Sequence, residues 1–260
     1  MTRLDTAAPD PVSGIGRYSD QYHSQGRAGD RRVLDVGLGA RAAVDTPGTG
    51  RVLASYRRAA YLALPGGLCA LTTAAAPAGP LHLRCRELPP CREGERVHTD
   101  GRTLRTEAWS LPLDAPTWVG PLPPAGRLPG AVGARELGEY AARLGGRGPG
   151  LTPAGDDVLA GLLLVASAAG SAGDARSRLA VVASVRTTEV AAGFLHWAAR
   201  GQCIEPAHAV LAALAELGAE ADAPACARLT TIGSSSGAAL LAGIRIGLGA
   251  RAPQLDLHLL

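Results

Sequence analysis

The first half of the chain carries short apolar runs that are separated by turn residues. Such runs lie between about residues 31 and 118: VLDVGL, RVLASY, AAYLAL, GLCALTT, LHLRC, TLRTEAW and SLPL. Stretches such as DTPGTG, PGG and REGE lie between them, and this pattern predicts short β-strands joined by turns. We therefore expect a small antiparallel sheet or a partly closed barrel over residues 31–125. Residues 1–30 are rich in Gly, Pro, Asp, Ser and Arg without periodicity, and we predict a flexible tail there.

After Gly133 the apolar positions recur every three or four residues, which is the period of a helix. Leu137, Tyr140, Ala141 and Leu144 fall on one face of such a helix. Further helices are predicted over residues 156–169, 175–185, 189–200, 206–217 and 236–248. A proline-dense segment, DAPTWVGPLPPAGRLPG, separates the two patterns and is a natural boundary. The fold class expected is α+β, with a β-rich N-terminal sheet or partial barrel followed by an α-helical C-terminal half over residues 126–260.

The composition excludes several classes of function. The 260 residues include no lysine, so all 26 basic residues are arginine, and neither a lysine Schiff base nor a P-loop lysine is available. A net charge of +3 with dispersed arginines gives no reason to expect a nucleic-acid partner. Five cysteines without a CxxC pair predict reduced thiols and a cytoplasmic protein. No leader-like segment opens the chain and no apolar run is long enough to span a bilayer, so we expect no membrane partner.

One stretch, RGPGLTPAGDDVLAG, combines glycines, prolines and two aspartates directly before a long apolar run. Thr152 as N-cap and Pro153 at the first helical position would start a helix there. A cap alone does not require Gly148, Gly150 or Gly155, whereas a backbone that approaches a ligand closely explains all three. Gly150 and Gly155 have the Walker A spacing, but an aspartate stands where that motif needs lysine. A nucleotide-binding P-loop is therefore excluded.

The same arrangement returns near the C-terminus. TPAGDDVLAGLLL aligns without gaps with SSSGAALLAGIRI, which begins at Ser234 and places Gly155 on Gly237. The alignment also places Gly161 on Gly243, so two helices would begin alike and pack through these small faces. In a chain rich in Gly and Ala, a chance match is the alternative. If the repeat is real, the helix N-termini converge on one anion-binding pocket, because they present unpaired N–H groups and a partial positive charge.

The chemistry of this pocket would come from carboxylates on one side and hydroxyls on the other. Asp156 and Asp157 lie at the start of a buried helix, where burial and the helix dipole act in opposite directions on their pKa. Either could act as a catalytic general base or accept a hydrogen bond from a substrate amide or amine, and the pair could also hold Mg²⁺. Ser234, Ser235 and Ser236 have no neighbouring His or Lys to activate them, so we interpret them as hydrogen-bond donors rather than nucleophiles.

Other polar residues receive ordinary structural interpretations. Thr187, Thr188 and Glu189 open another helix and are interpreted as a plain cap. His196 and Trp197 lie within that helix and are interpreted as packing residues. No histidine spacing in the sequence is typical of a metal site, and we assign no metal ligand by spacing.

Three stretches together are similar to a known family: GRGPGLTPAGDDVLAGLL, RTTEVAAGFLHWAARGQ and TTIGSSSGAALLAGI. They resemble the AllH-like family, formerly a domain-of-unknown-function family, which includes the third, small subunit of bacterial oxamate carbamoyltransferase. The similarity runs from about residue 30 to about residue 250 and is weak in the β-rich half. The resemblance implies that the chain works with two larger subunits to move a carbamoyl group between oxalurate or oxamate and phosphate. By motif, it places the site on the following residues: Gly148, Gly150, Thr152, Gly155, Asp156, Asp157, Ser234, Ser235 and Gly237.

The leading hypothesis is an enzyme or enzyme subunit that acts on a small carboxylate or amide together with a phosphate or carbamoyl-phosphate-like group, as in carbamoyl transfer. An alternative is a non-catalytic subunit or metabolite-binding partner of a larger complex. A third hypothesis is kinase-like phosphoryl transfer to a small molecule, because GSSSGAA resembles the G-S-S-S-x-A helix start of some kinases. The expected partners are a small-molecule substrate and larger enzyme subunits, and self-association into a homo-oligomer stays open.

Overall fold

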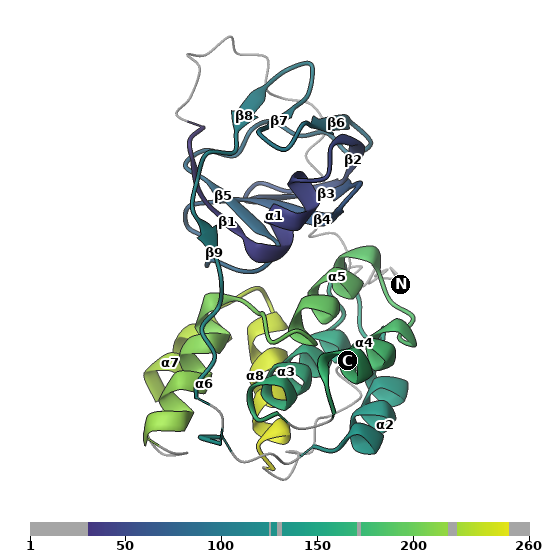
Figure 1. Cartoon of the computed structure of the whole chain (residues 1–260), viewed down its shortest axis with the longest axis vertical. Helices are drawn as coiled ribbons and strands as arrows, with labels where there is room; N and C mark the ends of the chain where they lie inside the picture. The colour runs from purple at the N-terminus through teal and green to yellow at the C-terminus, as the bar shows by residue number, and fades with distance from the viewer. Residues whose placement is uncertain (1–30, 125, 129–131, 171–172, 218–222, 250–260) are drawn as a thin grey trace, which may run out of the picture.

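The computed structural model describes residues 31–124, 126–128, 132–170, 173–217 and 223–249. Within them the chain forms a curled sheet stacked on a group of helices, joined by the extended segment that follows the last strand (Figure 1). The predicted α+β class, with a β-rich half followed by a helical half, is confirmed. The tail predicted for residues 1–30 lies outside the described residues, and the domain limit after residue 125 stays a prediction.

The first half is one curled, half-barrel sheet of nine strands. Their spatial order is β8-β7-β6-β2-β3-β4-β5-β1-β9, and the pairs β4–β5 and β1–β9 are parallel while the others are antiparallel. The turn-separated apolar runs predict this mostly antiparallel arrangement. The strands are β1 (Val33–Gly37), β2 (Gly48–Ser55), β3 (Ala59–Leu64), β4 (Gly67–Thr73), β5 (His82–Cys85), β6 (Arg96–Thr99), β7 (Thr103–Arg105), β8 (Ser110–Pro112) and β9 (Thr117–Trp118).

The inner face of the sheet closes around a short helix, α1 (Leu38–Val44). Ala40 and Ala43 of this helix are buried in one apolar core with strand residues such as Val52 and Leu62. The helix was not predicted, because the run VLDVGL, which ends at the first residue of the helix, is apolar without a helical period. Its seven residues are too few to show a 3.6-residue repeat.

The outer face of the sheet has two parts. Leu68 and Tyr61 lie on the part that packs against the helices, in a cluster with Leu151 and Val190. The part formed by β6 and β7 lies away from the helices (Figure 1) and presents polar side chains to solvent. Successive strand residues point to opposite faces of the sheet. The strands can therefore bury an apolar inner face both where helices cover the outer face and where solvent does.

The second half is built around one buried helix. Nearly every residue of α3 is buried, which agrees with a sequence that is apolar on all sides. Every predicted helix is present, but α7 was missed because its eight residues make barely two turns. None of the helices in the described ranges has the length and apolar character needed to cross a bilayer. The helices are α2 (Ala134–Leu144), α3 (Ala154–Ala168), α4 (Ala175–Ala183), α5 (Glu189–Ala198), α6 (Glu205–Leu217), α7 (Ala223–Thr230) and α8 (Ser236–Gly247).

Helices α3 and α8 cross at a pair of glycines. A Cβ at Gly161 would lie 2.3 Å from the Leu240 carbonyl oxygen, and a Cβ at Gly243 would lie 2.0 Å from the Val158 carbonyl oxygen. Both distances are far below van der Waals contact, so only glycine lets the two backbones come this close. Each contact reaches the carbonyl three residues before the partner glycine, so the two helices are related by approximate two-fold symmetry. The packing predicted from the sequence repeat is confirmed.

The repeat extends to the way in which each helix begins. A Cβ at Gly155 would lie 2.1 Å from the carbonyl oxygen of Leu144 in α2, and a Cβ at Gly237 would lie 1.9 Å from that of Leu229 in α7. Each glycine thus lets its helix start against the backbone of the preceding helix. The close approach that we expected toward a ligand is made, at these two glycines, toward the protein's own backbone.

The start of α3 differs from the prediction by one residue. Pro153, rather than Thr152, is the N-cap, and no side chain caps the helix. The Gly155 N–H instead donates to the Arg147 carbonyl at 2.9 Å, so the folded-back loop supplies the acceptor that a capping side chain would have provided. The Thr152 hydroxyl is left to face Ser236, 3.4 Å away.

Two buried side chains tie the segment after β9 to the helices. Gln202 accepts a hydrogen bond from the Gly120 N–H at 2.8 Å and donates one to the Gly120 carbonyl at 3.2 Å. His208 accepts a hydrogen bond from the Cys203 N–H at Nε2, and its Nδ1 lies 2.8 Å from the Pro121 carbonyl oxygen. The connection between the two halves is therefore held at two neighbouring points.

Replacing either crossing glycine should destabilise the protein strongly. In Gly161→Ala and Gly243→Ala the added methyl group meets backbone atoms, which cannot move aside as a flexible side chain can, and we expect losses of about 3 kcal/mol or more in the free energy of unfolding. The matched control is Gly138→Ala in α2, where an added Cβ meets nothing within 4 Å. That variant should gain about 0.5–1 kcal/mol, since alanine favours a helix interior. Urea unfolding of the three variants measures the change in the free energy of unfolding. Equal changes in the crossing variants and in Gly138→Ala would contradict the close crossing.

Candidate functional site

The N-termini of α3 and α8 lie side by side. Their contact is made by the Thr152 and Ser236 hydroxyls, whose oxygens are 3.4 Å apart. Leu151, next to this contact, packs against the same apolar cluster as Tyr61 of β3, so the helix starts lie on the side of the helical half that faces the sheet. Two helix N-termini at one place favour an anion or a polarised carbonyl, because their N–H groups and partial positive charges add. The convergence of the helix starts predicted from the repeat is confirmed by this contact.

The other predicted binding residues lie around this contact in different roles. Gly155 and Gly237 are buried in helix packing, as described above. Gly148 and Gly150 have φ values of 114° and 91°, a region that favours glycine, so local backbone conformation accounts for both. Two of the predicted hydrogen-bond donors are exposed at the start of α8: Ser234 and Ser235.

Asp156 is turned into the protein. Its Oδ1 accepts a hydrogen bond from the Gly146 N–H at 2.9 Å, and its Oδ2 accepts one from the Thr187 hydroxyl. Burial raises the pKa of Asp156, while these two hydrogen bonds lower it. Thr187, which we interpreted as part of a cap, is therefore a partner of Asp156, and Thr188 alone is the N-cap of α5. We assign Asp156 to holding the loops around α3 rather than to chemistry.

Asp157 is the carboxylate at the meeting point of the two helices. Burial raises the pKa of Asp157 to about 7, the charge of Asp156 adds to the rise, and hydrogen bonding from Ser236 opposes it. The Oδ2 of Asp157 is buried and has no hydrogen-bond partner among the described residues. A buried carboxylate oxygen without a partner is costly, and carboxylates perturbed in this way mark functional sites. Of the two predicted aspartates, Asp157 has the properties of a proton carrier near neutral pH.

The sheet contributes a tyrosine that the sequence did not single out. Burial raises the pKa of Tyr61, and the negative charges of Tyr56 and Asp157 raise it further. The rings of Tyr56 and Tyr61 meet edge to face, with centroids 6.4 Å apart. The alternation in AAYLAL places Tyr61 and Leu62 on opposite faces of the sheet. Nothing in the sequence shows which of these faces the helices cover.

The site suits a magnesium ion poorly. Both oxygens of Asp156 already accept hydrogen bonds, so a cation shared with Asp157 would have to displace the Gly146 N–H or the Thr187 hydroxyl. Magnesium also requires near-octahedral oxygen ligands, mostly carboxylates, phosphates and water. Across the described ranges, no group of three or more His, Cys, Asp or Glu side chains is arranged to hold a metal. We therefore derive no step through a metal ion.

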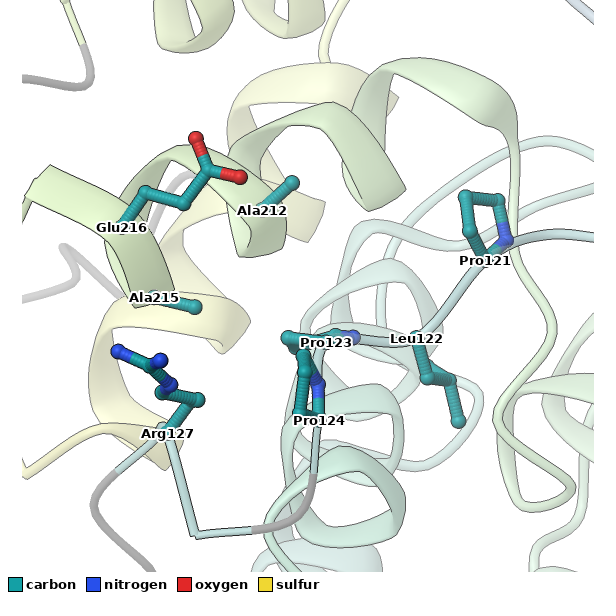
Figure 2. Close-up of a pocket in the computed structure, with 8 residues that line it drawn as sticks. All are labelled: Pro121, Leu122, Pro123, Pro124, Arg127, Ala212, Ala215 and Glu216. Carbon is teal, nitrogen blue, oxygen red and sulfur yellow. The ribbon is translucent and has the colours of Figure 1, made fainter.

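Two surface hollows are formed by described residues, and the lining of one reaches Thr231 and Ile232, just before the start of α8. One, of about 530 Å³, adjoins the loop Ala74–Ala78, and its two arginines, Arg84 and Arg228, are already paired with Asp35 and Glu205. Neither hollow contains a predicted site residue, so neither replaces the Asp157 region as the candidate site. The other hollow, of about 400 Å³, is lined by the proline-rich connection and α6 (Figure 2): Pro121, Leu122, Pro123, Pro124, Arg127, Ala212, Ala215 and Glu216.

Comparison with known families points to the same part of the chain. Residues 144–248 match the family model described as oxamate carbamoyltransferase subunit AllH. Over this range the helical half is similar to that family. The matched range contains both helix starts and Asp157, whereas the sheet, where we expected weak similarity, lies outside it. No curated protein and no solved structure matches the chain. The description of that family names a subunit of a carbamoyltransferase.

The raised pKa of Asp157 should make its contribution to stability depend on pH. Between about pH 4 and about pH 7 the folded protein keeps a proton that the unfolded chain has released, so the free energy of unfolding falls as pH rises and levels off above the folded pKa. Asp157→Asn removes this dependence. Urea unfolding at about pH 5 and about pH 8 should therefore show the variant gaining stability relative to the original protein at the higher pH. If the difference in free energy of unfolding between the variant and the original protein is the same at both pH values, Asp157 has an ordinary pKa.

Asp156→Ala should behave differently from any change at Asp157. It leaves the partly buried Gly146 N–H and Thr187 hydroxyl without their acceptor, which costs at most about 1–3 kcal/mol for each donor. We expect a lower melting temperature at every pH. Retention of the full melting temperature would contradict the structural role of Asp156.

Proposed function

We propose that this AllH-like chain supplies the substrate site of a multi-subunit carbamoyltransferase, at the joined N-termini of α3 and α8. The substrates are a small carboxylate amide of the oxamate type and a carbamoyl-phosphate-like group. The observation that carries the proposal is the buried Oδ2 of Asp157, which has no hydrogen-bond partner among the described residues and lies where two helix starts meet. The family description supports the type of reaction, and the side-chain geometry supports the location of the site at the N-termini of α3 and α8.

The helix starts suit the anionic parts of such substrates. The hydroxyls of Thr152 and Ser236 can donate hydrogen bonds, and the two helix dipoles favour negative charge at the same point. A carboxylate or phosphate bound there would bring the reacting carbonyl close to these donors. Charge that develops on the carbonyl oxygen during attack would then be stabilised by groups that are already oriented.

Asp157 suits the proton that the reaction must move. In carbamoyl transfer to an amide, the amide nitrogen forms a bond to the carbamoyl carbon, and the bond from that carbon to the phosphate oxygen breaks, with phosphate leaving as the electron-pair acceptor. The attacking nitrogen loses a proton, which the ionised Asp157 carboxylate accepts. In the reverse direction the protonated carboxyl returns it. A pKa of about 7 leaves both forms populated at neutral pH, which is what both directions require.

Tyr61 supplies a neutral donor from the sheet side. Its raised pKa keeps the phenol protonated throughout the neutral range. It packs in the same cluster as Leu151, next to the helix starts, so the sheet covers the site and limits its contact with water. A drier site strengthens each of the hydrogen bonds to the substrate.

Turnover by the assembled enzyme tests the role of Asp157. In a complex of this chain with its larger subunits, Asp157→Asn should lower kcat for carbamoyl transfer between carbamoyl phosphate and oxamate by about 10²- to 10⁴-fold. The original enzyme should lose rate as pH falls through about 7, and the variant should lack that inflection. Ser236→Ala, which removes one donor and keeps the carboxylate, should lower the rate less and keep the inflection.

The matched control is Ser234→Ala, an exposed hydroxyl outside the Thr152–Ser236 contact, which should change kcat by about twofold at most. Full turnover in Asp157→Asn, with the complex intact, would contradict the catalytic role and favour a non-catalytic subunit. Loss of the complex itself would be seen by size-exclusion chromatography and separates assembly from chemistry.

A further inference from the structure

The uncovered part of the outer sheet face carries a row of positively charged and histidine side chains. Strand register pairs Arg51 on β2 with Arg96 on β6, and pairs His98 on β6 with Arg105 on β7. Residues directly opposite one another point to the same face of a sheet, and positions two apart on one strand share that face. These four residues, Arg51, Arg96, His98 and Arg105, are therefore neighbours, and we call them the basic ladder.

The basic ladder has little acidic compensation. Arg51 has one carboxylate nearby, Glu189 at 3.7 Å, and more than half of each side chain is exposed, so this pair is weak. The charge of Arg105 helps to lower the pKa of Asp100, but the Asp100 carboxylate already accepts two backbone hydrogen bonds of its turn. Arg96 is exposed and forms no hydrogen bond or ion pair within the described part of the chain.

Folding alone gives no reason for this arrangement. Like charges directly opposite one another on paired strands are destabilising, and Arg51 faces Arg96 in this way. The sheet is held together from its inner face, where Val52 and Val97 are buried in the apolar core. An acidic surface placed on the outer face would relieve the repulsion and pair with the guanidinium groups.

We propose that the basic ladder docks an acidic surface of a larger subunit of the enzyme. Its polar neighbours on the same face, Thr49, Thr103 and Ser110, provide hydrogen-bonding groups for a polar interface. Among the described strands that form this part of the face, β2, β6, β7 and β8 contain no Phe, Tyr or Trp side chain on which a base could stack, which favours an acidic protein over a single-stranded nucleic acid. Strands β6 and β7, which carry Arg96, His98 and Arg105, lie away from the helical half (Figure 1), and Arg51 is the ladder residue that reaches it, through Glu189 of α5. Docking on β6 and β7 therefore leaves the Asp157 region open to substrate. The identity of the partner rests on the proposed function. The presence of the basic ladder rests only on strand register and exposure.

The test is a charge reversal that leaves the site untouched. Calorimetric titration of the purified full chain with its purified larger subunits should give a Kd that is about tenfold or more weaker for R96E/R105E. The matched control is R143E/R176E, two exposed arginines of α2 and α4 with the same total charge change, which should stay within about twofold. Binding of the original chain should also weaken as salt rises from about 50 mM to about 300 mM.

Equal losses in the two double variants, no loss in R96E/R105E, or no binding of the larger subunits by the original chain would each overturn the proposal. A single-stranded RNA 20-mer serves as the competing probe. If R96E/R105E loses RNA binding while its Kd for the subunits is unchanged, the ladder belongs to a polyanion instead. Asp157→Asn, measured in parallel, should bind the subunits normally whatever its turnover, so failure of docking and failure of catalysis are told apart.

Discussion

The crossing of α3 and α8 at Gly161 and Gly243 is the contact on which the helical half depends. At this crossing the two backbones touch through glycine, and the side chains of this half fill the space around them. A Cβ added at either glycine would lie only 2.0–2.3 Å from a carbonyl oxygen of the other helix. A contact of this kind fixes the position of one helix along the other, because sliding by one residue would put a side chain where only hydrogen fits. It thereby fixes which residues of the two helix starts meet.

The consequences of that crossing are electrostatic. Two helix starts held side by side bring two partial positive charges together. These charges repel one another, so the dipoles alone would not favour this arrangement. Asp157 lies at the same point, with a carboxylate oxygen that no described group satisfies. Burial disfavours its charge, while the helix starts and Ser236 favour it, and the balance leaves the pKa of Asp157 near neutrality. A packing constraint thus produces a titrating group in a place suited to anionic substrates.

The sequence predicted the fold class, the helices and the repeat because each depends on local periodicity or on small residues at fixed spacing. It did not separate Asp156 from Asp157, since adjacent helix residues differ by about 100° in direction and only the packed structure shows which one faces protein donors. It interpreted Gly155 as a ligand contact, although the backbone of α2 fills that space. Tyr61 was missed because its role depends on which sheet face the helices cover, a long-range fact that strand alternation does not contain.

The central claim, that the joined helix starts give Asp157 a near-neutral pKa at a substrate site, is tested most directly by carbon NMR of aspartate labelled at the carboxyl carbon. Comparison with Asp157→Asn assigns the resonance. The account predicts a titration midpoint near 7 in the free protein and a shifted midpoint when oxamate or carbamoyl phosphate is added, because a bound anion changes the charge beside the carboxylate. A midpoint near the ordinary aspartate value of about 4, unmoved by either compound, would contradict it.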